Sequence, residues 1–191
     1  LVYIGDNGKG MDAAGVQRAM RYGAPERENK ASLGKFGLGL KTASSSVCLR
    51  YTVISRCSPE QELVKLTWDL DHVANVEKWE MLKEPVTADE LEMFDDLCGE
   101  TGTLVVWEKC DRILTKEYEP GSTNERAAIT RLADTLSRQL SLVFHRFLDT
   151  IDSRERNIAI FINQQPVEPW NPFYPARSEP VSYTHLRAHE T

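Results

Sequence analysis

Two glycine-rich motifs near the start of the chain constrain its fold more than any other feature. The first occupies 6–11 (DNGKGM) and directly follows an apolar run, which places Asp6 at the end of an expected buried strand. The second, at 34–44, sets three glycines before a stretch that can form a helix. A carboxylate can read a nucleotide base and bare backbone amides can hold its phosphates. The order of the two motifs therefore favours a nucleotide site.

The first motif has both a chemical and a purely structural explanation. An ionised Asp6 on a buried strand would need a donor, because an unpaired buried charge is costly, and an adenine amine would supply one. Gly8 and Gly10 permit a tight turn and close approach by a flat ring, on which Met11 would pack. The structural explanation is an Asx turn after a strand. A calcium loop is excluded, because Gln17 would be its twelfth residue and the glycines its third and fifth.

The second motif also leaves two explanations open. Gly34, Gly37 and Gly39 leave backbone amides unshielded at the expected start of a helix, where orphan donors and the helix dipole bind phosphate. Lys41 and Thr42 would add a cation and a hydroxyl. The motif is not a P-loop, because one extra residue precedes the Lys-Thr pair. The structural explanation is a loop followed by close helix packing at the glycines.

Taken together, the motifs resemble those of the GHKL ATPases, which share the Bergerat fold and include gyrase B, heat-shock-90-type chaperones, sensor histidine kinases, MutL and MORC proteins. The D-x-G-x-G block of that group is matched at 6–10 and its G-x-x-G-x-G block at 34–39. Gly102-Thr103 resembles the Gly-Thr that opens a later strand. The amino-acid sequence at 33–41 is most similar to that of the chaperone and MORC branches.

The resemblance implies an ATP site and assigns its residues. Asp6 would accept the adenine amine, Thr103 would approach the adenine directly or through water, and Lys41 would reach the terminal phosphate. Residues 22–36 would form a lid over the nucleotide. The implied cofactor-binding residues are Asp6, Gly8, Gly10, Met11, Gly34, Lys35, Phe36, Gly37, Leu38, Gly39, Lys41, Thr42 and Thr103.

The resemblance also implies Mg²⁺ and a catalytic base, neither of which can be assigned within the chain. The family takes its Mg²⁺-binding Asn and its water-activating Glu from a helix upstream of the first motif. This chain begins at Leu1, inside the expected strand. We therefore expect an N-terminally truncated fragment that does not hydrolyse ATP by itself. The resemblance allows for a homodimer of the longer parent.

Composition fits one ATP-binding domain over 1–175, followed by a disordered or non-native tail at 176–191. The 191 residues are 41% hydrophobic and carry a net charge of −6. Residues 1–56 hold nine Lys/Arg against four Asp/Glu, as a polyphosphate site requires. The overall acidity argues against direct nucleic-acid binding, and no apolar run is long enough to span a membrane. The four cysteines form no C-x-x-C pair, and this lack of pairing is typical of a reduced cytoplasmic protein. The histidines do not suggest a metal site.

The hydrophobic pattern predicts an α/β fold, a two-layer sandwich of a mixed, largely antiparallel sheet with helices on one face. We expect strands at 1–5, 49–56, 62–70, 103–108 and 158–162, and helices at 12–21, 38–47, 88–97 and 124–148. Thr87 opens a capping box, and Asn124 is expected to cap the last helix. The apolar stripe of that helix is interpreted as core: Ile129, Leu132, Leu136, Leu140, Val143 and Phe147.

Three functions compete at this point. The first is an ATP-binding domain whose parent uses nucleotide to drive a conformational switch. The second is a histidine-kinase catalytic domain, against which the acidic insertion at 71–101 and the proline-rich segment at 167–173 argue. The third is an interaction module that has lost its nucleotide, against which the intact Asp6 and motif glycines argue.

Overall fold

The structure is a computed structural model that describes residues 1–22, 38–152 and 157–172. It contains two compact units, Leu1–Thr115 and Lys116–Thr191, here called the N-terminal and C-terminal units. Each unit is described by itself. Of the predicted site, residues 34–37 lie outside the described part of the chain, as do most of the expected lid and the expected tail.

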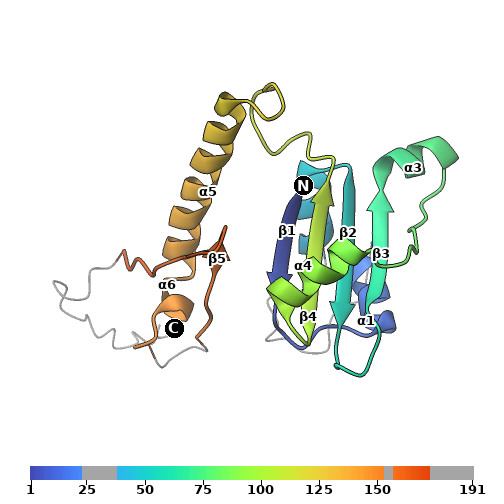
Figure 1. Ribbon diagram of the computed structural model, residues 1–191, viewed down its shortest axis with the longest axis horizontal. Coiled ribbons are helices and arrows are strands. Elements are labelled where there is room, and N and C mark those ends of the chain that lie inside the picture. Colours follow the sequence, from blue (N-terminus) through green and yellow to red (C-terminus); the bar gives the residue numbers. More distant parts are fainter. Residues whose placement is uncertain (23–37, 153–156, 173–191) are drawn as a thin grey trace, which may run out of the picture. The chain divides into compact units, whose positions relative to one another are not determined.

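The N-terminal unit is built on a four-stranded antiparallel sheet (Figure 1). Its strands are β1 (Val2–Asp6), β2 (Arg50–Arg56), β3 (Val64–Asp69) and β4 (Gly102–Glu108), in the order β1-β4-β2-β3. The strands predicted at 49–56 and 62–70 are confirmed, and as β2 and β3 they pair directly as a hairpin. β4 comes from later in the chain and lies between β1 and β2. Asp6, at the start of the first motif, and the Gly102-Thr103 pair therefore lie on adjacent strands.

Four helices accompany the sheet: α1 (Ala13–Met20), α2 (Gly39–Val47), α3 (Leu70–Val76) and α4 (Ala88–Cys98). Asp12 starts α1 by accepting a hydrogen bond from the Gly15 amide at 2.7 Å. Thr87 starts α4 through the predicted capping box, in which its hydroxyl accepts from the Glu90 amide and the Glu90 carboxylate accepts from the Thr87 amide.

Side chains of β2 alternate between two hydrophobic clusters, one on each face of the sheet. Tyr51 and Val53 pack with α1 in the first cluster, while Ile54 packs with Phe94 of α4 in the second. Figure 1 shows α4 and α1 on opposite faces of the sheet. The α/β class and the antiparallel sheet with its helical layer are confirmed. The structure adds that α4 covers part of the other face, which the sequence pattern alone did not indicate.

Charged side chains fix the segment between α3 and α4 to the sheet. The Arg50 guanidinium lies 2.6–3.0 Å from the carboxylates of Asp69, Glu84 and Glu108. Burial raises the pKa of Asp69, but the hydrogen bonds from Arg50 and from the His72 amide outweigh it, so the pKa lies below its ordinary value. Arg50 therefore joins Glu84 of the acidic insertion to carboxylates of β3 and β4, and Lys65 and Lys109 add ion pairs to Glu90 and Asp71.

The C-terminal unit contains α5 (Thr123–Val143), α6 (His145–Leu148), β5 (Phe161–Ile162) and β6 (Gln165–Pro166). The prediction that Asn124 caps the long helix is wrong. Ser122 is the N-cap, because its hydroxyl accepts from the Glu125 amide at 3.1 Å. The expected single helix also divides at Phe144, and the strand expected at 158–162 is shorter than predicted.

Within the C-terminal unit taken by itself, most of the α5 stripe is not covered, and its interpretation as core stays a prediction. Ala128 is the buried residue of α5, whereas four members of the stripe are exposed: Ile129, Leu132, Leu136 and Val143. Helical periodicity identifies an apolar face but not the element that covers it. Among the described helices of both units, none is long and apolar enough to cross a membrane.

Candidate functional site

The first motif forms a turn that runs from the end of β1 into α1. Asp6 is the last residue of β1 and lies opposite Thr103 of β4 in the antiparallel register. Its Oδ1 accepts a hydrogen bond from the Gly8 amide at 2.9 Å, so the Asx turn predicted as the structural explanation is present. The expectation of a buried carboxylate is wrong, because Asp6 ends an edge strand and is exposed. Its remaining acceptor sites are open to a ligand.

Gly10 is required by the packing of the turn against the ends of β2 and β4. Its φ is +61°, a backbone conformation that side chains with a Cβ rarely adopt. A Cβ at this position would lie 2.0 Å from the Arg56 carbonyl oxygen and 2.9 Å from that of Gly102. The sequence analysis attributed this glycine to the approach of a flat ring. The structure shows a backbone neighbour that is sufficient to require it.

Ser55 joins the turn to the two strands behind it, and the sequence analysis did not identify it. Its buried hydroxyl accepts from the Met11 amide at 2.8 Å and donates to the Gly102 carbonyl at 2.7 Å. The same oxygen lies 3.0 Å from the Thr103 hydroxyl. A serine hydroxyl has one proton, which Ser55 uses on Gly102, so Thr103 must be the donor in the contact between the two hydroxyls.

This hydrogen-bond order determines what the site offers to a ligand. Thr103 uses its proton on Ser55 and keeps acceptor capacity on its hydroxyl oxygen, while Asp6 on the neighbouring strand is an acceptor when ionised. The end of the β1–β4 pair therefore carries two acceptors. Thr101 stabilises the same turn, because its hydroxyl donates a hydrogen bond to the Gly8 carbonyl at 3.1 Å.

The backbone around Asp6 is held closely from both sides. A Cβ on Gly5 would lie 2.7 Å from the Leu97 Cβ of α4, and one on Gly102 would lie 2.0 Å from the Asp6 carbonyl oxygen. Burial raises the pKa of the neighbouring Cys98 thiol to about 11, so this thiol is neutral at physiological pH. We infer that these contacts fix the position of Asp6.

The second motif is described from Leu38 onward. Leu38 is the N-cap residue of α2 and provides no side-chain hydrogen bond to the amides of the first turn. Gly39 begins the helix, and a Cβ there would meet no atom of the described residues within 4 Å. Thr42 donates its hydroxyl to the Leu38 carbonyl at 2.9 Å, so its proton is used within the helix.

Lys41 lies in a different place from the one expected of a phosphate ligand. The residue is fully buried, its Nζ donates to the Ala19 carbonyl at 2.9 Å, and it lies 5.9 Å from the centre of the Tyr22 ring. Burial lowers the pKa of Lys41. In this conformation the ammonium joins α2 to the end of α1. A contact with a terminal phosphate stays a prediction, and it would require the side chain to leave this position.

The family to which the chain belongs is established by comparison with known proteins. A family model described as "Histidine kinase-, DNA gyrase B-, and HSP90-like ATPase" matches residues 1–103, which is more than half of the chain. The chain is a member of this family, and the N-terminal unit is an ATP-binding domain of the GHKL ATPase type. The matched region ends at Thr103 and so contains both glycine motifs. A search of curated proteins found no match.

Proposed function

We propose that the N-terminal unit binds the adenine of ATP at Asp6 and Thr103, and that nucleotide binding drives a conformational switch in the protein. The observation that carries the proposal is the pair of adjacent acceptors at the end of β1 and β4. The amino-acid sequence at 33–41 favours the chaperone and MORC branches over the histidine-kinase branch. We further propose that 1–175 is one ATPase domain of a cytoplasmic protein that forms a homodimer.

The two acceptors match the edge of adenine and not that of guanine. Adenine has an exocyclic amine with two hydrogens, so Asp6 and Thr103 can each accept one, directly or through a water molecule. Guanine has a carbonyl oxygen at the same ring position, which would face two acceptors without a proton between them. Guanine would leave both acceptors of the site without a donor, which lowers its affinity relative to that of adenine. The arrangement therefore predicts selection of ATP over GTP.

The start of α2 is proposed to hold the phosphates. The lack of a side-chain cap from Leu38 leaves amides at the positive end of the helix dipole. Bound Mg²⁺ would offset charge on the phosphates. Phosphate oxygens are usual Mg²⁺ ligands at nucleotide sites and would supply several of its ligands here.

The test is a titration of the full chain with ATP and with GTP, comparing the wild type with Asp6→Asn. Asparagine keeps an oxygen for the Gly8 amide, so the turn is retained while the negative charge is lost. Loss of a charge-assisted hydrogen bond costs about 1.5–3 kcal/mol, or roughly 10- to 150-fold in ATP affinity. Asp89→Asn is the matched control, because Asp89 is an exposed carboxylate in the first turn of α4. Equal ATP affinity in the wild type and in Asp6→Asn would contradict the proposal.

A further inference from the structure

A second site lies in the N-terminal unit, apart from the turn that contains Asp6. It is a cavity of about 520 Å³ lined by Gln17, Arg21, Tyr22, Trp68, Trp79 and Met81. This volume is in the range of small-molecule sites. Tyr22 is also the first residue of the expected lid and its ring centre lies 5.9 Å from the Lys41 Nζ, whereas the other lining residues are not assigned to the nucleotide site. The cavity lies along the later part of α1, whereas the Asp6 turn precedes the first residue of that helix.

Three aromatic rings form one end of the cavity. The centres of the Tyr22, Trp68 and Trp79 rings lie 5.6–5.9 Å from one another, in edge-to-face arrangements. Trp68 is buried and donates its indole N–H to the Met20 carbonyl at 3.0 Å, and the Tyr22 hydroxyl lies 3.2 Å from the Tyr51 hydroxyl. These two rings are therefore held in place before any ligand arrives.

Trp79 is the unusual member of this group. Its side chain is 71% exposed although it contacts two other aromatic rings, so most of a large apolar surface faces solvent beside the cavity. Met81 adds a flexible, polarizable side chain to the lining. A flat apolar molecule would cover this surface and contact all four side chains.

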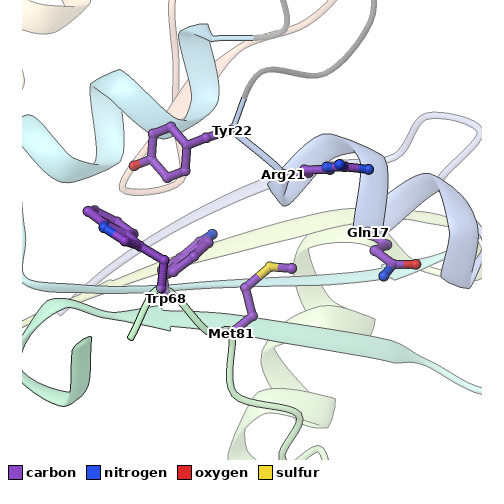
Figure 2. Close-up of a pocket in the computed structure, with 6 residues that line it drawn as sticks. Gln17, Arg21, Tyr22, Trp68 and Met81 are labelled. Atoms are coloured by element: carbon purple, nitrogen blue, oxygen red, sulfur yellow. The ribbon is translucent and has the colours of Figure 1, made fainter. Parts of the chain in front are cut away.

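The other end of the cavity is polar. In Figure 2, Gln17 and Arg21 lie at one end of the cavity, and Tyr22 and Trp68 lie at the other end. Met81 lies between these two pairs. Within residues 1–22, 38–152 and 157–172, Arg21 forms no ion pair with an acidic side chain. A guanidinium in this position matches a carboxylate or another planar anionic group, and the Gln17 amide can add a hydrogen bond.

We propose that this cavity binds a flat apolar molecule that carries an anionic group, with its ring system against Trp68, Trp79 and Tyr22 and its acid at Arg21. The complementarity of one aromatic end and one cationic end selects this class over a purely apolar or a cationic ligand. The site does not depend on the nucleotide function of the Asp6 turn.

The experiment uses two fluorescent probes with the full chain. Anilinonaphthalene sulfonate has fused aromatic rings and an anionic group, and N-phenyl-1-naphthylamine has the same rings without the charge. Trp79→Ala is expected to weaken both probes about tenfold, because aromatic contact area is lost. Arg21→Gln is expected to weaken only the sulfonate, about three- to tenfold. Far-UV circular dichroism of each variant shows that the fold is retained.

Matched controls separate this cavity from other apolar surfaces. Arg18→Gln removes an exposed arginine from the same helix, and Trp170→Ala removes an exposed tryptophan from the C-terminal unit. Neither control is expected to change the affinity for either probe. An effect of the controls equal to that of the test variants overturns the proposal.

Three further results would also overturn it. Absence of saturable sulfonate binding excludes the site, and equal weakening of both probes by Arg21→Gln removes the anionic part of the assignment. Displacement of the probe by ATP places the probe in the nucleotide site. A dimer in sedimentation that the probe dissociates would assign the cavity to a second copy of the chain.

Discussion

The hydroxyl oxygens of Ser55 and Thr103 lie 3.0 Å apart on neighbouring strands, and the proton of Ser55 is committed to the Gly102 carbonyl. Thr103 is therefore aligned as a donor toward Ser55 and as an acceptor toward the Asp6 side of the sheet. Ser55 also accepts from the Met11 amide at 2.8 Å. One serine thus sets both the position of the first motif and the hydrogen-bonding direction of Thr103.

Ser55→Ala is expected to destabilise the N-terminal unit by about 1–3 kcal/mol, because it leaves the Met11 amide without its acceptor. The same change frees the Thr103 proton and should reduce the preference for ATP over GTP. Chemical denaturation measures the first effect and competitive titration the second. Ser46→Ala is the control, because Ser46 is exposed and donates only to the Ala43 carbonyl. An unchanged ATP/GTP ratio in Ser55→Ala would show that Thr103 does not depend on Ser55.

Local sequence signals predicted much of the N-terminal unit. The apolar run before Asp6 and the capping box at Thr87 each act through neighbouring residues, and each element formed as expected. Pairing of Asp6 with Thr103 was anticipated only through the family resemblance. No local rule places β4 between β1 and β2.

The residues that sequence reasoning missed depend on tertiary contacts. Ser55 is one of several polar residues in β2, and only the tertiary fold gives its hydroxyl three partners. Lys41 follows a phosphate-binding pattern, yet it is buried against the Ala19 carbonyl. Asn124 and Ser122 are both good N-cap residues. The helix begins after Ser122, whose hydroxyl accepts a hydrogen bond from the Glu125 amide three residues later.

Gly10→Ala is expected to disrupt the turn through two additive effects. The positive φ costs about 1 kcal/mol for a residue with a Cβ, and the new Cβ would lie 2.0 Å from the Arg56 carbonyl oxygen, which must then move. We expect a total loss of more than about 2 kcal/mol in the free energy of unfolding. Gly121→Ala has a similar φ of +76° with open space around it and should show only the first effect. Equal losses in the two variants would mean that the contact with Arg56 is unimportant.

Gly39→Ala is expected to separate folding from phosphate binding. No atom of the described residues lies within 4 Å of the added Cβ, and alanine is the better helix former, so the thermal midpoint should hold or rise slightly. If the start of α2 holds phosphate, the added methyl group should hinder the approach of phosphate to the amides, and ATP affinity should fall about two- to tenfold, a loss comparable to that of one hydrogen bond. Adenosine lacks phosphates and should bind equally well to both proteins in the same titration. A parallel loss of adenosine affinity would point to a change in the adenine site instead.

The last prediction concerns Lys65 and Glu90, whose ammonium and carboxylate lie 2.8 Å apart with side chains 5% and 15% exposed. Burial raises the pKa of Glu90, but the hydrogen bond from Lys65 and the Thr87 amide outweigh it, and the pKa lies below its ordinary value of 4.5. The stability that Glu90 contributes is therefore fully present above about pH 4.5 and is lost as the pH falls through the folded-state pKa.

Lys65→Met removes the ammonium that pairs with Glu90, while Glu90 stays buried, so the pKa of Glu90 should rise. The free energy of unfolding at pH 7 should fall by about 3 kcal/mol. A carboxyl group with a raised pKa regains stability as the pH falls toward its unfolded value. The difference in unfolding free energy between wild type and variant should therefore shrink between pH 7 and pH 4. Urea denaturation across this range measures it, with the exposed Lys83→Met as control. A difference that stays constant with pH would mean that Lys65 acts by packing alone and not through the charge on Glu90.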